Sequence, residues 1–290
     1  MKLSFNTFRK CLLPAVTFIS LAVPTKTAKD NINSDFSNLP KIDDKEILKK
    51  ELASLTIVAD TNFVGGINHR FDDESIQKLK KRIYTPDFML EYKAPIKNEK
   101  NVYLEPFGYF FANRPNNNKK RPHMGLDIFV SPLSKKPKTP VLVQAPVDGV
   151  IISHKRARST DNVVGNRVTL LGKDGRRYSF DHLARPTDYP DSIPMPTVGT
   201  IMKAGDPIGY VGSTGETTLW HLHLNVMTDE ALKKQQSSIF WKKIAEQSPY
   251  SSLCGQVNPL SNKDAGPIAN ELCKYKGAKP DAKGDFNLAK

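Results

Sequence analysis

Short alternations of apolar and polar residues dominate the chain between residues 102 and 227, and this pattern predicts many short strands. The apolar runs are rich in β-branched residues and are separated by Gly, Pro, Asn and Asp. The predicted strands are Val102–Phe111, Met124–Val130, Val141–Ala145, Gly149–His154, Asn166–Leu171, Arg176–His182, Pro207–Val211 and His221–Met227. Lys173–Gly175, between two of these strands, has the composition of a hairpin turn. Together the strands predict a mainly β fold.

Helical spacing appears on both sides of this β segment. One helix is predicted over Asp44–Leu55 and a second over Asp73–Ile83, where apolar residues recur at i, i+3 and i+7. A helical pattern returns at Asp229–Glu246. Residues 57–70, between the first two helices, are interpreted as a Gly- and Asn-rich loop, with a segment that covers the active groove as the alternative.

The N-terminus has the layout of an export signal. Lys2, Arg9 and Lys10 precede an apolar run, Cys11–Val23, which at 13 residues is shorter than the ~20 that a membrane-spanning helix needs. We therefore predict a signal peptide over residues 1–28 and an exported protein, in the periplasm or cell envelope or secreted. An uncleaved N-terminal anchor stays open as the alternative. Cys11 leaves with the signal peptide or stays near the membrane, so Cys254 and Cys273 remain as an even pair, which predicts a disulfide.

Composition narrows the class of protein. The 290 residues are 39% hydrophobic, which excludes a disordered chain, and a mean hydropathy of −0.45 excludes a multi-span membrane protein. The net charge of +13 favours a polyanionic partner. Nucleic acid is not expected, because no motif interleaves the charges with aromatic residues. Basic pairs such as Lys155–Arg156 are interpreted as solvated surface, as are His69 and His154.

Four histidines and one carboxylate carry the candidate chemistry. Side chains alternate between the two faces of a strand, and in residues 122–130 the even positions are apolar, so His123 and Asp127 share the other face. The same alternation places His221 and His223 together. His, Asp and His supply the ligand atoms that zinc accepts, and three protein ligands leave a fourth position for water. Spacing alone does not establish that the two strands meet.

These residues resemble the lysostaphin-like (LytM-type) zinc endopeptidases that cut peptidoglycan. The resemblance covers about residues 105–228, and it lies in the order and content of six short motifs. They are His123-x-Gly125-x-Asp127-Ile128, Val143-Gln144-Ala145-Pro146-x-x-Gly149-Val150, Gly165-Asn166-x-Val168, Asp181-His182-Leu183, Gly205–Gly215 and His221-Leu222-His223.

Carried over residue by residue, the resemblance implies antiparallel sheets of the duplicated-hybrid-motif type and one Zn²⁺ per chain. His123, Asp127 and His223 would bind the metal. His182 and His221 would be catalytic residues that handle the water and the developing oxyanion. The substrate would be the peptide stems of peptidoglycan, and contact with a membrane would come only through an uncleaved anchor. The oligomeric state is not indicated.

The resemblance also sets the expected domain plan. Trp220 and Asn225 depart from the family pattern, and the family's terminal Val-Asn-Pro-Leu appears only at Val257–Leu260, which indicates inserted helices near residues 229–256. The expected plan is a signal peptide (1–28), a helical or irregular N-terminal region (29–100), a peptidase domain (101–262) and a C-terminal extension with a polar tail (263–290).

Two other functions are compatible with the same residues. A catalytically inactive module that binds the cell wall or activates an amidase would be expected to lose ligand or general-base positions, and here all five are present. A secreted zinc protease that acts on proteins would share the chemistry and differ only in the lining of its groove.

Overall fold

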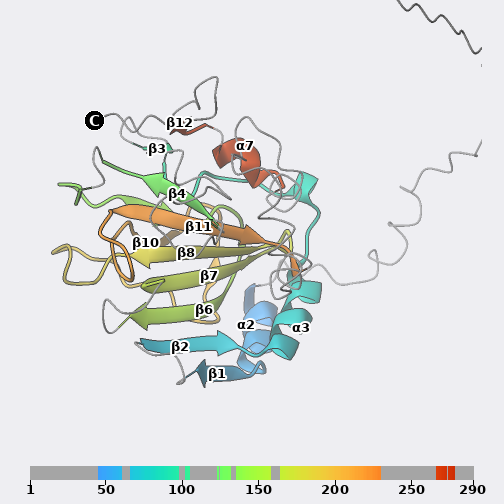
Figure 1. The fold of residues 1–290 in the computed structure, drawn as a ribbon. Helices are drawn as coiled ribbons and strands as arrows, with labels where there is room; N and C mark the ends of the chain where they lie inside the picture. Colours follow the sequence, from blue (N-terminus) through green and yellow to red (C-terminus); the bar gives the residue numbers. More distant parts are fainter. Residues whose placement is uncertain are drawn as a thin grey trace, which may run out of the picture. The chain divides into compact units, whose positions relative to one another are not determined.

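A large, mostly antiparallel sheet forms the body of the protein in the computed structural model (Figure 1). The structure describes residues 45–60, 66–97, 102–104, 123, 125–131, 135–157, 164–229, 266–272 and 274–277. The strands are β1 (Ile57–Asp60), β2 (Gly66–Phe71), β3 (Tyr103–Leu104), β4 (Leu126–Phe129), β5 (Leu142–Gln144), β6 (Gly149–Ala157), β7 (Asn166–Gly172), β8 (Arg177–Leu183), β9 (Ile201–Met202), β10 (Pro207–Tyr210), β11 (His221–Met227) and β12 (Lys276–Gly277). The helices are α2 (Lys45–Ala53), α3 (Asp73–Ile83), α7 (Ile268–Leu272) and the 3₁₀ turn η1 (Asp87–Met89).

The strand order places distant parts of the sequence side by side. It runs β1-β2-β6-β7-β8-β11-β4-β3-β12, with β9 beside β6, and a separate two-stranded sheet pairs β10 with β5. All described pairs are antiparallel except β12 with β3. The mainly β fold of antiparallel sheets that the sequence predicted is confirmed.

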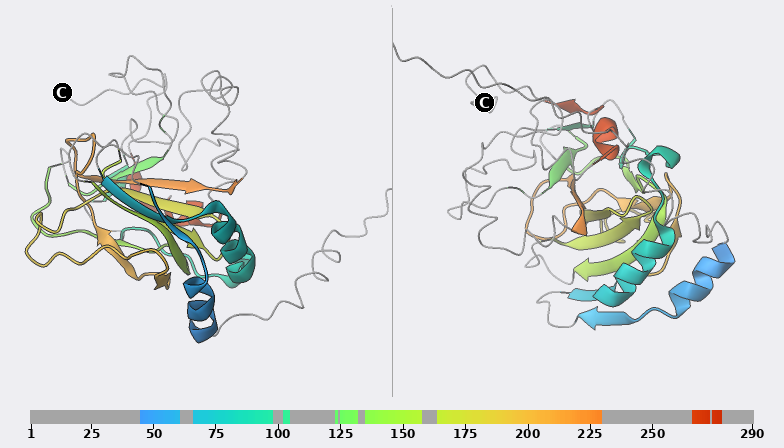
Figure 2. Two further views of the ribbon diagram at one scale, coloured as in Figure 1. Left: turned by 90° about the horizontal axis from the view of Figure 1, so that it is seen from below. Right: turned by 90° about the vertical axis from the view of Figure 1, so that its right-hand side faces the viewer.

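Two apolar layers hold the sheet, one on each face. The inward residues of β4, β7, β8 and β11, such as Phe180 and Leu222, pack with Val143 and Ile208 of the small sheet. On the other face, α2 and α3 pack over one end of β6 and β7, where Ile76 of α3 joins a cluster with Leu171 (Figure 2). The alternation in the predicted strands therefore corresponds to burial between two layers.

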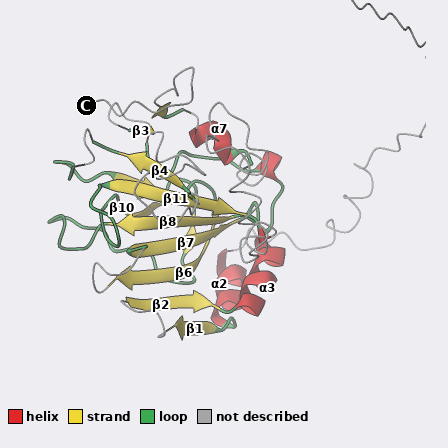
Figure 3. Ribbon diagram, viewed as in Figure 1, coloured by secondary structure: helices red, strands yellow, loops and turns green. Residues whose placement is uncertain are grey.

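The N-terminal region differs from its expected helical or irregular form. Both predicted helices form, at Lys45–Ala53 and Asp73–Ile83, and Asp72 caps the second by accepting a hydrogen bond from Ser75 N. Between them, however, β1 and β2 form a hairpin, and β2 pairs with β6 (Figure 3). Residues 57–60 and 66–71 therefore extend the edge of the sheet, where β6, β7 and β8 separate them from β11.

The expectation that His154 lies on the surface is wrong. The side chain is 7% exposed, because β6 continues to Ala157 and pairs on both sides, with β2 and with β7. The neighbouring Lys155 is 2% exposed, so Lys155–Arg156 is not simply a solvated pair. His69 is exposed, as expected.

Several predictions fall on residues that the structure does not describe. They are the signal peptide over 1–28, the pairing of Cys254 with Cys273, the helices near 229–256 beyond Asp229, and the strand Val102–Phe111 beyond Leu104. They stay predictions, as do the domain boundaries. Within the described ranges, none of the helices combines the length and the apolar character that crossing a membrane requires.

Tyr275 ties the C-terminal segment to the β core. The backbone N–H of Ile96 donates to its hydroxyl at 2.9 Å, and that hydroxyl donates to the carbonyl of Ile96 at 2.5 Å. We expect Tyr275→Phe to lower the free energy of unfolding by about 1–3 kcal/mol, because both groups of Ile96 lose their partner in a buried place. Urea unfolding measures this. Tyr210→Phe is the control, since no described residue bonds that hydroxyl, and an equal loss there would refute the assignment.

Candidate metal centre and catalytic histidines

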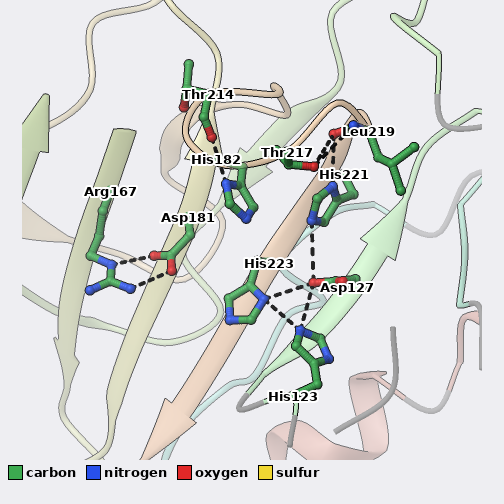
Figure 4. A network of polar contacts seen from close by, with 10 residues as sticks. All are labelled: His123, Asp127, Arg167, Asp181, His182, Thr214, Thr217, Leu219, His221 and His223. Atoms are coloured by element: carbon green, nitrogen blue, oxygen red, sulfur yellow. Dashed lines mark hydrogen bonds and ion pairs between the residues drawn. The ribbon is translucent and has the colours of Figure 1, made fainter. Parts of the chain in front are cut away.

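The predicted ligands come together because β11 lies between β4 and β8. In the antiparallel register, His223 stands opposite Asp127 on one side and opposite Asp181 on the other. Leu222 and Leu224 point into the core, so His221 and His223 project from the opposite face, as alternation requires. His123 reaches the same place from just before β4 (Figure 4). The meeting of the two strands, which spacing left open, is thus a property of the sheet order.

Three donor atoms converge to within hydrogen-bonding distance of one another. His123 Nε2 lies 2.9 Å from His223 Nδ1 and 3.1 Å from Asp127 Oδ1, and the last two atoms are 2.9 Å apart. Zinc with four tetrahedral bonds of about 2.0–2.1 Å spaces its ligand atoms by about 3.3 Å. The set therefore fits zinc with only small movements, and it is the one group of His, Cys, Asp and Glu suited to a metal among the described residues.

The carboxylate of Asp127 is held in its charged form. Its side chain is 3% exposed, and burial alone would raise its pKa. The charges of His123 and His221 and the hydrogen bonds from His123 and His223 outweigh burial and hold the pKa of Asp127 well below its usual range. An anionic oxygen is the form in which a carboxylate binds a metal.

Gly125 leaves space for the ring of His223. A Cβ at this position would overlap the imidazole of His223 and would lie 2.7 Å from the carbonyl of Leu224. Glycine is thus required between His123 and Asp127, because the ring of His223 from the neighbouring strand β11 fills the space of a side chain.

We expect Gly125→Ala to lower zinc affinity at least tenfold, on the scale of about 10–100-fold seen when a ligand's support is disturbed. Competition with a chromophoric chelator measures the affinity. Gly209→Ala is the matched control, because its new Cβ would meet neighbours only at 3.7 Å. Wild-type affinity in the Gly125→Ala protein would show that His223 is not held as a ligand.

His182 owes its position to a bulge in β8. Between the pairs Asn166–Leu183 and Val168–Phe180, β8 has one residue more than β7, so Asp181 and His182 together oppose Arg167. His182 has φ +60°, the left-handed region, and it is the single described residue other than glycine with a positive φ. The bulge leaves two successive side chains, Asp181 and His182, on the face of the sheet that carries the ligands, where Asp181 points toward Arg167 (Figure 4).

Backbone carbonyls fix the tautomers of the two non-ligand histidines. His182 Nδ1 donates to the carbonyl of Thr214 at 2.7 Å, and His221 Nδ1 donates to that of Leu219 at 2.9 Å. In each neutral ring Nε2 is then the basic nitrogen. The rings lie side by side, with centroids 4.8 Å apart, and burial together with the charge of His221 lowers the pKa of His182 to about 4. Two oriented bases thus stand beside the donor set.

The sequence reasoning missed two parts of this site. It assigned no role to Arg167 and Asp181, which form an ion pair next to His223, although strand alternation places Arg167 and Thr169 on one face. It also missed the backbone carbonyls of Thr214 and Leu219 that accept hydrogen bonds from His182 and His221, because a pattern of side chains does not indicate backbone partners. Trp220, singled out as a departure, packs against Tyr189 of the loop after β8 with ring centroids 5.9 Å apart.

Comparison with known proteins places the chain in a family. The model of peptidase family M23 matches residues 121–236, which contain all five candidate residues. The catalytic domain of the antimicrobial peptidase lysostaphin from Staphylococcus simulans is 30% identical over 41% of this chain and 76% of that domain, with a TM-score of 0.30.

Two further solved structures are similar at lower identity. A zinc-containing peptidase from Vibrio cholerae is 21% identical over 56% of this chain and 43% of its own, with a TM-score of 0.35. The catalytic domain of the prophage-encoded M23 protein EnpA from Enterococcus faecalis is 20% identical over 45% and 84%, with a TM-score of 0.32. No curated protein matches the chain. The family match and the identity to lysostaphin confirm the resemblance that the motifs indicated, and the chain belongs to peptidase family M23.

Proposed function

We propose that the protein is a zinc-dependent endopeptidase that hydrolyses the peptide cross-links of bacterial peptidoglycan after export to the periplasm or cell envelope. Membership of family M23 supports a peptidase that acts on peptidoglycan. The single observation that carries the metal-dependent part is the convergence of His123 Nε2, Asp127 Oδ1 and His223 Nδ1 beside two oriented imidazoles.

The five residues divide into ligands and bases. His123, Asp127 and His223 would hold zinc, which when bound polarises a carbonyl and lowers the pKa of water toward ~7. His182 and His221 present Nε2 toward this point, because each Nδ1–H is committed to a carbonyl. A neutral Nε2 can accept the proton of an attacking water and return it to the leaving amine, and the second ring can stabilise the oxyanion.

Hydrolysis by the three ligands and the two histidines needs no nucleophilic serine or cysteine. Nε2 of His221 lies 3.5 Å from Asp127 Oδ1, so the base sits within one hydrogen-bond length of the ligand set. His182 is held beside it, with its ring centroid 5.9 Å from that of His223. This compact arrangement favours direct attack by water on a peptide bond bound at the sheet face, with no acyl-enzyme.

Digestion of purified sacculi tests the proposal. The zinc-loaded protein should release soluble muropeptides, and mass analysis should show one added water per cleaved peptide bond and no new reducing sugar ends. Failure to release fragments while binding sacculi would favour an inactive wall-binding module. Efficient cleavage of an unfolded protein substrate, with sacculi left intact, would favour a protease that acts on proteins.

A further inference from the structure

The sheet face that carries the histidines continues across three more strands with polar side chains. His223 stands opposite Asp181 on β8, the bulge sets Asp181 opposite Arg167 on β7, and Arg167 stands opposite Lys155 on β6. Since alternation keeps these residues on one face, Asp127, His223, Asp181, Arg167 and Lys155 form a single row, here called the polar row. Figure 4 shows the part from Asp127 to Arg167.

The ion pair in the polar row is unevenly buried. Arg167 Nε and Nη2 donate to the two carboxylate oxygens of Asp181, each at 2.5 Å. The Asp181 side chain is 3% exposed, whereas that of Arg167 is 32% exposed. Arginine has five N–H donors, and the three that Asp181 does not take find no other partner among the described residues. The guanidinium is therefore fixed on one side and open on the other.

The charge of this part of the row suits an anion. Arg167 on β7 and Lys155 on β6 stand opposite each other, so two cationic side chains adjoin in the row. A guanidinium that is already oriented loses little side-chain freedom when it binds, and its planar donors match a carboxylate.

We propose that Arg167 is a specificity-determining residue that binds a free carboxylate of the substrate peptide. The inference rests on the proposed function and names the substrate class of that site. Strands lie about 4.8 Å apart, so Arg167, two strands from His223, is about 10 Å from the metal centre. An extended peptide advances roughly 3.3–3.6 Å per residue, so the carboxylate belongs two or three residues from the scissile bond.

The test compares untreated sacculi with sacculi whose carboxylates are converted to carboxamides by carbodiimide and ammonia. The wild-type protein should cleave the untreated substrate at least tenfold faster. The double variant Arg167→Gln/Asp181→Asn should reduce this preference below about threefold. It removes both charges together, so neither an unpaired buried carboxylate nor a changed net charge confuses the result.

Arg82→Gln/Glu51→Gln is the matched control. This pair joins α2 and α3 away from the site, and the exposure of its arginine, 34%, matches the 32% of Arg167, so its loss should leave the preference at tenfold. A retained preference in the Arg167 double variant, or equal cleavage of both substrates by the wild type, would overturn the inference and leave the proposed function standing.

A second measurement separates carboxylate binding by Arg167 from the proposed hydrolysis of peptidoglycan. Co-sedimentation of His221→Ala protein with both kinds of sacculi measures binding without turnover. Tighter binding to untreated sacculi that disappears with the Arg167 double change would support Arg167 as the carboxylate site even if hydrolysis failed. Equal binding to the two substrates would count against it.

Discussion

Asp127→Ala is expected to abolish zinc binding and, with it, peptide hydrolysis. Asp127 is the only anionic ligand of the set, and it contacts His123, His221 and His223 through one oxygen. Loss of a hydrogen-bonding neighbour of a ligand already lowers metal affinity about 10–100-fold, so loss of the anionic ligand itself should exceed about 100-fold. The rate should fall at least about 10³-fold, since a bound metal lowers the activation free energy by several kcal/mol.

Asp148→Asn serves as the control for removing a carboxylate. Asp148 accepts hydrogen bonds from Lys203 Nζ and Ala204 N, away from the site, and this variant should keep one zinc per chain. Metal content by mass spectrometry and turnover of sacculi are measured on the same samples. Full zinc occupancy in the Asp127→Ala protein would exclude Asp127 as a ligand.

His182→Ala and His221→Ala should separate metal binding from catalysis. Neither ring is one of the three converging donors, so each variant should keep its zinc. Each should lose at least about 10²-fold in kcat, because a positioned acid–base group contributes about 10²–10⁴-fold. Because the two rings act on one reaction, the double variant should lose less than the product of the single losses.

His69→Ala is the matched control for these variants. His69 is an exposed histidine on β2, three strands from β8 in the sheet order, and its removal should leave kcat unchanged. Near wild-type turnover in the His182→Ala or His221→Ala protein would remove that histidine from the catalytic pair, whatever its zinc content.

Local alternation explains how much of this site could be predicted from the sequence. The even apolar positions of residues 124–130 fix His123 and Asp127 on one face, and Leu222 and Leu224 do the same for His221 and His223. Alternation is a property of a single strand, so it identifies side chains that share a face. It does not identify strand neighbours, and the contact of β11 with β4 followed only from the resemblance and then from the structure.

The bulge in β8 is the clearest feature that alternation could not predict. Counting from Phe180, which lies in the core, strict alternation would place His182 in the core as well. One extra residue and a positive φ turn it outward instead, beside Asp181. The partner of Asp181 was hidden for the same reason, because Arg167 faces it only through this irregular register.

The edge strands were missed for a different reason. Residues 57–60 and 66–71 are short, and the second has three consecutive polar residues, Asn68–Arg70, which favour a loop over an alternating strand pattern. Pairing with β6 makes them strands, and this is a long-range contact that no local pattern encodes. His154 was misjudged as a surface residue because the same pairing covers it.

Anomalous diffraction at the zinc absorption edge tests the central claim most directly. Crystals grown with one equivalent of zinc should show one strong peak per chain, at about 2.0–2.2 Å from His123 Nε2, Asp127 Oδ1 and His223 Nδ1, the bond lengths of a zinc site. A peak bound by other residues, or no peak with these three side chains in hydrogen-bonding contact, would contradict a zinc peptidase built on this site.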